Sequence, residues 1–183
     1  MLSPTHSELL TPIGMAHARE AVIARNSWFL HVSGEHCFNG LKQSGILPHN
    51  PGKAIETDLA EAIGDNSGCI VCLRPIFTLD TTPKREHDQI VLAISNSDLP
   101  LRVGIDWSYD GCWGLVDVLA HEAPHSISSN IFSEVVRRTG CVVSYDPVPL
   151  DVIRVWTTGT PQIDPAKWPL LSQTPIANVR ILK

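Results

Sequence analysis

The sequence contains no long apolar run: none of its hydrophobic stretches approaches the ~20 residues that a membrane-spanning helix requires. Its first residues have no basic segment followed by an apolar one, so we expect no signal peptide. Basic residues are few and dispersed, with 14 Lys and Arg against 19 Asp and Glu and a net charge of −5. This balance gives no electrostatic support for sequence-independent binding to a phosphate backbone. We also expect no membrane partner.

Common nucleotide-binding and hydrolase motifs are absent as well. No Walker A motif, no G-x-G-x-x-G and no G-x-S-x-G occurs. The letters H-E-x-x-H do occur at His121–His125, but Pro124 occupies the fourth position. In zinc peptidases one helical turn brings both imidazoles to one face, and a proline inside that turn costs ~3 kcal/mol or more. We therefore predict that these histidines bind no zinc and that the chain holds no metal.

The cysteine count is odd, so the cysteines cannot all pair within one chain. Without a signal peptide, an odd count favours reduced thiols and a cytoplasmic location. The five cysteines are Cys37, Cys69, Cys72, Cys112 and Cys141.

Length and hydrophobic patterning predict one mixed α+β domain over residues 1–183. We expect residues 1–12 to form an irregular arm and residues 157–183 an extended, proline-rich tail over the surface. Between them the helices come early and the strands late, with tight turns between consecutive strands. That order favours a largely antiparallel sheet flanked by short helices. The predicted helices are 13–26, 37–43, 54–63 and 115–120, and the predicted strands are 28–32, 69–77, 89–95, 101–105, 141–144 and 152–156.

The segment W-F-L-H-V-S-G, residues 28–34, is the most informative part of the chain. Its apolar start predicts a buried strand that carries His31 and Ser33 to a turn just before a helix. Strand ends fix side chains in place while the following loop leaves room for a ligand, so this is a common place for a site. The alternative is a histidine that only caps the helix or fills the edge of the core.

Two separated segments of the chain resemble the ADP-ribosyltransferase fold, especially its compact bacterial, DNA-modifying-toxin-like members. The first is the strand with His31-x-Ser33, followed by a helix and then Gly45-Ile46-Leu47-Pro48. The second is Glu134 followed by P-V-P-L-D-V-I at residues 147–153. Members of this family have a similar opening and a similar Glu-bearing closing segment.

The resemblance implies a split core of antiparallel sheets and NAD as a co-substrate. It assigns His31 to a ribose of NAD and Ser33 to the nicotinamide amide. It assigns Glu134 to stabilising the cation that forms as nicotinamide leaves, and Arg74 to a basic role beside a phosphate. The aromatic candidates for stacking on nicotinamide are Trp107 and Tyr109.

Several alternatives remain open at the level of the sequence. Residues 128–140 also have the pattern of a helix, with polar residues at the start, basic residues in the last turn and a glycine at the end. Glu134 would then lie on a helix and not on a strand. The chain could also be a non-catalytic binding or immunity-type protein on the same scaffold, with exposed tryptophans as anchors. An RNA 2′-phosphotransferase would share the fold but needs more basic residues. The tryptophan candidates are Trp107, Trp113 and Trp168.

Overall fold

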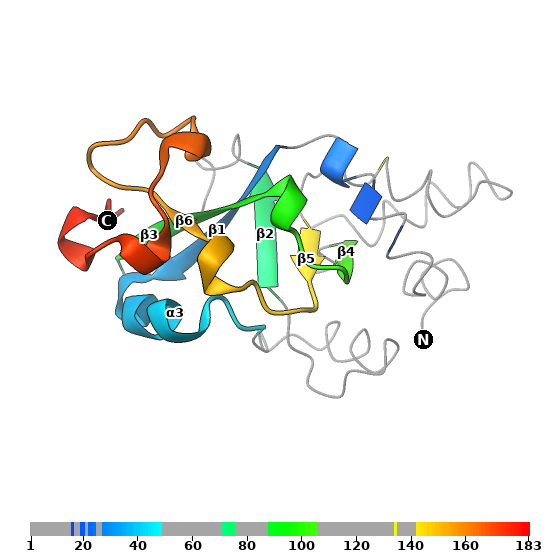
Figure 1. The fold of residues 1–183 in the computed structure, drawn as a ribbon, viewed down its shortest axis with the longest axis horizontal. Helices are drawn as coiled ribbons and strands as arrows, with labels where there is room; N and C mark the ends of the chain where they lie inside the picture. The colour runs from blue at the N-terminus through cyan, green and yellow to red at the C-terminus, as the bar shows by residue number, and fades with distance from the viewer. Residues whose placement is uncertain are drawn as a thin grey trace, which may run out of the picture. The chain divides into compact units, whose positions relative to one another are not determined.

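The computed structural model describes residues 16, 19–20, 22–24, 27–48, 71–75, 88–105, 134 and 142–183 (Figure 1). The chain divides into two compact units. Unit 1 contains Met1–Arg25, Pro48–Cys72 and Pro100–Asp146, and unit 2 contains Asn26–Leu47, Leu73–Leu99 and Pro147–Lys183. The predicted helices at 54–63 and 115–120 lie outside the described residues, as do Trp107, Tyr109, Trp113, His121 and His125. The expectation of a single domain stays a prediction.

Six strands form a sheet in the order β4-β5-β2-β1-β3-β6. β1 pairs antiparallel with both β2 and β3, β3 pairs antiparallel with β6, and β4 pairs antiparallel with β5. The predicted α+β class with a largely antiparallel sheet is therefore confirmed. The strands are β1 (Trp28–Gly34), β2 (Val71–Pro75), β3 (Gln89–Ser95), β4 (Val103–Ile105), β5 (Val142–Ser144) and β6 (Arg154–Val155).

The core of unit 2 forms around β1 and β3. Six of the seven residues of β3 are buried, which explains its continuous apolar sequence, because a strand covered on both faces does not alternate with polar residues. On one face Leu30 packs with Val91 and Ala93, and Trp156 and Trp168 cover them. The two indole rings are stacked with their centroids 6.0 Å apart. This face is the apolar centre of the unit.

A short helix follows β1 and ends at a glycine. The 3-10 turn η1 (Glu35–Cys37) leads into α3 (Phe38–Ser44), which buries Phe38 and Leu41. Gly45 ends the helix with φ of 73°, in the region that favours glycine. The next residue, Ile46, forms an antiparallel bridge with Val148 through hydrogen bonds of 3.0 and 2.9 Å. The two segments that carry the family resemblance are therefore hydrogen-bonded to each other.

The prolines of residues 157–183 predict an extended tail over the surface, but this C-terminal segment does not have that structure. It alternates extended residues with three 3-10 turns, and Trp168 and Leu171 within it are fully buried. Backbone hydrogen bonds tie it to β6 and β3, at Val155 and Gln89. Proline fixes φ but does not prevent the indole and leucine side chains from entering the core. The three turns are η5 (Pro165–Lys167), η6 (Leu171–Gln173) and η7 (Ile176–Asn178).

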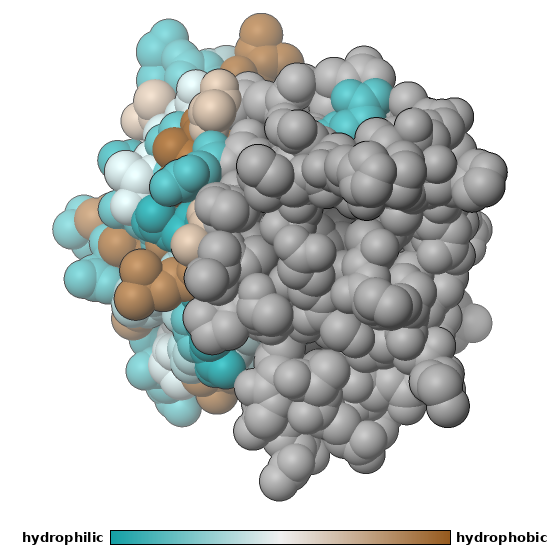
Figure 2. Space-filling view, turned by 90° about the vertical axis from the view of Figure 1, so that its right-hand side faces the viewer, coloured by the Kyte–Doolittle hydropathy of each residue, from teal (hydrophilic) through white to brown (hydrophobic). Residues whose placement is uncertain are grey.

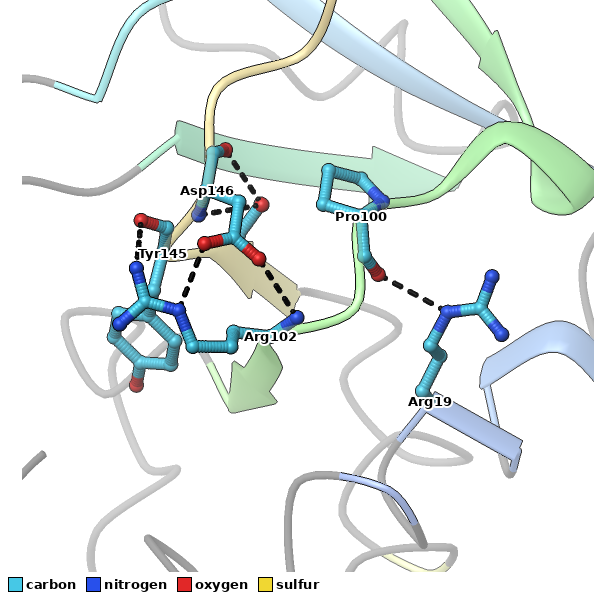
Figure 3. A network of polar contacts seen from close by, with 6 residues as sticks. Arg19, Pro100, Arg102, Tyr145 and Asp146 are labelled. Carbon is cyan, nitrogen blue, oxygen red and sulfur yellow. Dashed lines mark hydrogen bonds and ion pairs between the residues drawn. The ribbon is translucent and has the colours of Figure 1, made fainter. Parts of the chain in front are cut away.

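In unit 1, a polar network joins the chain before β4 to the chain after β5 (Figure 3). Arg102 Nε lies 2.7 Å from Asp146 Oδ1, and the backbone N–H of Arg102 donates to Asp146 Oδ2 at 3.0 Å. Ser144 Oγ donates to the carbonyl of Asp146 at 2.8 Å. Arg19 Nε donates to the carbonyl of Pro100 at 3.0 Å. These contacts hold the ends of the two-strand pair together.

The exposed apolar side chains of the described residues are dispersed. Leu47, Leu101 and Ile163 are each more than half exposed, but they come from separate segments. In Figure 2 the coloured part of the surface accordingly shows brown areas separated by teal ones. Within the described ranges, no helix has the length and apolar character needed to cross a membrane.

Candidate functional site

β1 places His31 and Ser33 on the same face of the sheet. Successive residues of a strand point to opposite faces, so residues two apart share a face, as do directly paired antiparallel residues. His31 pairs with Leu92, and Ser33 pairs with Ile90. Both side chains therefore project to the face opposite Leu30 and the stacked tryptophans. His31 is 8% exposed and Ser33 is half-buried, so this face becomes more exposed toward the end of the strand.

Arg74 lies on the other face. It pairs with Leu30, which pairs with Ala93, which pairs with Arg154. The four residues form one cross-strand row on the tryptophan side of the sheet. The register of β2 against β1 therefore places Arg74 on the face opposite His31. The role that the resemblance assigns to Arg74 stays a prediction, and this geometry does not favour it.

Arg154 has a structural partner in the same row. Its guanidinium donates to the carbonyl of Trp168 at 2.6 Å and lies 5.7 Å from the ring centroid of Trp28. Arg180 lies similarly over Trp156, at 5.6 Å. Trp168 itself is fully buried and donates its indole N–H to the carbonyl of Pro161 at 2.7 Å. The expectation that Trp168 is a surface anchor is therefore wrong, because its ring belongs to the core.

A hollow of about 390 Å³ lies directly after the end of β1. Glu35 and His36 line it from η1, Phe38 and Asn39 from the first turn of α3, and Ile176 from the C-terminal segment. Glu35 is half-buried, whereas His36 and Asn39 are exposed. Polar side chains thus meet the apolar Ile176 in one concavity, the combination that small-ligand sites use.

Glu35 is the one acidic side chain among the described residues that line this hollow. Among the residues that the structure describes, no ion pair or hydrogen bond engages the carboxylate of Glu35 or the amide of Asn39. Lys42 is not among the residues that line the hollow, and its Nζ lies 5.8 Å from the ring centroid of Phe38. The same Nζ donates to the carbonyl of Thr174 at 3.0 Å, which fixes the ammonium there.

A second hollow of about 360 Å³ lies beside the C-terminal segment. Hydroxyl and amide side chains line it, including those of Thr158, Gln173 and Asn178, with Pro169 and Pro175 as apolar walls. None of the described residues that line it has an ionisable side chain, so these residues offer no group for acid–base chemistry.

Glu134 is helical and half-buried. The family resemblance implies a Glu-bearing strand, whereas Glu134 itself is helical in the structure. Its catalytic role stays a prediction. The two aromatic candidates for stacking, Trp107 and Tyr109, lie outside the described residues. In the described part of the chain, no group of three or more His, Cys, Asp or Glu side chains is placed to hold a metal ion.

Glu35 and Asn39 did not stand out in the sequence. The available signal was their position, because both follow the strand that ends at Gly34 and precede or begin a helix. They meet Ile176 only because the C-terminal segment, far along the chain, folds back against this hollow. Local patterning does not contain that information. Comparison of the chain with protein-family models, with curated proteins and with solved structures finds no match.

Proposed function

We propose that this protein is an NAD-dependent ADP-ribosyltransferase-like enzyme that transfers ADP-ribose to a macromolecular acceptor. The observation that carries the proposal is the placement of His31 and Ser33 on one face of β1, with a hollow directly after the strand. The bridge between Ile46 and Val148 adds support, because it joins the two segments on which the family resemblance rests. The finer fold assignment, an ADP-ribosyltransferase-like split core, is part of the same proposal.

The proposed reaction needs side chains that position NAD and a charged side chain that stabilises the cation formed. His31 and Ser33 would hold the ribose and the amide at the nicotinamide end of NAD. Breaking the bond between nicotinamide and ribose leaves positive charge on a ribose carbon, which a fixed carboxylate stabilises better than water does. Glu134 is the proposed carboxylate. The acceptor nucleophile then bonds to that ribose carbon and loses a proton.

The described side chains suit some parts of NAD better than others. Hydroxyl, imidazole and amide groups match the riboses and the carboxamide by hydrogen bonding. A diphosphate would be matched by Arg or Lys, but Arg74 lies on the opposite face from His31. We therefore assign no residue of this chain to the diphosphate.

The test is the release of nicotinamide from NAD, with and without candidate protein and nucleic-acid acceptors. Glu134→Gln keeps the volume and loses the charge, so kcat should fall ~10²-fold or more while NAD binding survives. His31→Gln should raise KM for NAD. Asp151→Asn, at an exposed carboxylate of the 3-10 turn η4 (Leu150–Val152), is the matched control and should behave like the wild type. Absence of release under every condition would refute the enzyme proposal.

One observation favours a second function, a non-catalytic protein that binds its ligand on the same scaffold. Glu134 is helical, whereas the catalytic Glu implied by the resemblance lies on a strand. NAD would then stabilise the folded protein without being consumed. Binding at 100 times Kd raises the free energy of unfolding by ~2.7 kcal/mol, which a thermal melt detects. Stabilisation by NAD without nicotinamide release would identify this function.

A further inference from the structure

We propose that the hollow lined by Glu35, His36, Phe38, Asn39 and Ile176 binds a vicinal diol on a sugar ring, as in the ribose of a nucleoside. For its biological ligand this inference rests on the proposed function, because NAD carries a second ribose on its adenosine side. The recognition chemistry itself is independent of catalysis.

The carboxylate of Glu35 and the amide of Asn39 make no hydrogen bond to the described residues, which favours a ligand that donates hydrogen bonds to them. The carboxylate of Glu35 accepts only, and its two oxygens match two adjacent hydroxyl groups. The amide of Asn39 both donates and accepts, as a sugar hydroxyl does. Within the part of the chain that the structure describes, neither side chain has an ion pair or hydrogen bond to give up. Binding a diol would therefore break no contact within the protein.

The surroundings disfavour two competing ligands, a phosphate and a cation stacked on Phe38. A phosphate would lie against the carboxylate of Glu35, and like charges at close range repel. A cation would find the face of Phe38 unavailable, because that side chain is only 5% exposed and the ammonium of Lys42 lies 5.8 Å from its ring centroid. Lys42 is held in place by its hydrogen bond to the carbonyl of Thr174. A neutral ligand with hydrogen-bond donors meets neither obstacle.

The wall of the hollow fits the carbon side of such a ligand. Ile176 is 40% exposed and provides an apolar surface for a sugar ring or an attached base. β1 ends at Gly34, roughly 10 Å along the strand from His31, and Glu35 is the next residue. Two ribose sites separated in this way leave room for a diphosphate between them, so one dinucleotide can occupy both.

The test uses adenosine, which is neutral and carries the diol without any phosphate. Titration followed by NMR should show saturable binding of adenosine, with 2′-deoxyadenosine and 3′-deoxyadenosine about 10-fold weaker or worse. Glu35→Gln should weaken adenosine about 10-fold and leave 2′-deoxyadenosine nearly unchanged. Asp151→Asn, the control carboxylate in the same unit, should change neither. Methyl β-D-ribofuranoside separates the sources: binding as tight as adenosine would identify a saccharide site, and much weaker binding a nucleoside site.

The outcomes separate this inference from the proposed function. Diol-dependent and Glu35-dependent binding of adenosine, without nicotinamide release from NAD, would leave the hollow as a diol site and refute the enzyme. Nicotinamide release with an unchanged KM in Glu35→Gln would overturn the inference while the enzyme stands. Equal binding of adenosine and its deoxy analogues would also overturn the inference, as would no binding of adenosine at millimolar concentration. Both comparisons use the wild-type protein alone, so they do not depend on whether a variant folds.

Discussion

Gly45 is the residue whose backbone conformation determines how the chain leaves α3. Its φ is 73°, and an added Cβ would collide with the carbonyl oxygen of Val148 and approach the backbone nitrogen of Leu150 to 2.9 Å. We expect Gly45→Ala to lower the free energy of unfolding by ~1–3 kcal/mol, measured by urea denaturation. Gly40→Ala in the same helix is the control, since nothing lies within 4 Å of its Cβ. It should stabilise by ~0.5–1 kcal/mol. Equal stability of the two variants would contradict the argument.

Trp168 shows how one side chain carries much of the packing in the C-terminal segment. It is fully buried, stacks on Trp156 and donates a hydrogen bond to Pro161. Trp168→Ala should cost ~3–5 kcal/mol because it leaves a large cavity. Trp168→Phe should cost less, since it keeps a ring and loses the donor while Pro161 remains able to bind water. Thermal melts of both variants test this order. A loss below 1 kcal/mol for the Ala variant would show that the segment does not depend on the ring.

Residue-scale prediction from the sequence succeeded for some side chains and not for others. A buried strand carrying His31 follows from the apolar residues on either side of it. The face that Arg74 occupies follows from the register between β1 and β2, which no local pattern records. A slip of one residue would move Arg74 to the face of His31, because side chains alternate along a strand. The sequence therefore predicts which residues belong to the candidate site, but not which of them lie on the same face of the sheet.

At the scale of the elements, strands with continuous apolar sequence were predicted best. Residues 89–95 were expected as a strand and form β3 with the same bounds. The expected strand 152–156 is shorter in the structure, because Leu150–Val152 forms a 3-10 turn directly after Pro149 and only Arg154–Val155 pairs as β6. Single 3-10 turns have no repeating apolar pattern, so the three turns of the C-terminal segment had no signal in the sequence.

The pairing of β4 with β5 depends on a polar contact as well as on backbone hydrogen bonds. Asp146 accepts from both the side chain and the backbone of Arg102. We expect Asp146→Ala to lower the free energy of unfolding by ~1 kcal/mol. Most of this loss should come from the hydrogen bond between the carboxylate and the backbone N–H of Arg102, because the ion pair is partly exposed and screened by solvent. Asp164→Ala is the matched control, since its pair with Lys167 is more exposed and should cost ~0–0.5 kcal/mol. Urea denaturation of both variants at low and high salt tests this, and equal losses would contradict it.

At the scale of the whole molecule, the thiols give a direct check on the predicted chemical state. Among the described residues, neither Cys37 nor Cys72 is part of a disulfide. The odd count of five predicts that the remaining cysteines are reduced as well. Alkylation of the native protein without reductant, followed by mass spectrometry, should find no internal disulfide. A protected pair would refute the prediction and would favour an oxidising compartment over the cytoplasm.

The two compact units are each built from three segments of the chain, so no single cut separates them. β2 passes from one to the other, with Val71 in unit 1 and Leu73 in unit 2, both fully buried. Because one continuous strand belongs to both, we expect a single cooperative unfolding transition. Leu73→Ala should lower the free energy of unfolding by ~2–5 kcal/mol and Val71→Ala by ~2 kcal/mol.

Urea denaturation followed by far-UV circular dichroism and by tryptophan fluorescence tests this expectation. Both variants should shift one common transition, with the two probes coincident as two-state unfolding requires. If Val71→Ala instead splits the transition or moves one probe alone, the units unfold independently. In that case β2 connects them in sequence without coupling their stabilities, and a substitution in unit 1 would leave the stability of unit 2 unchanged.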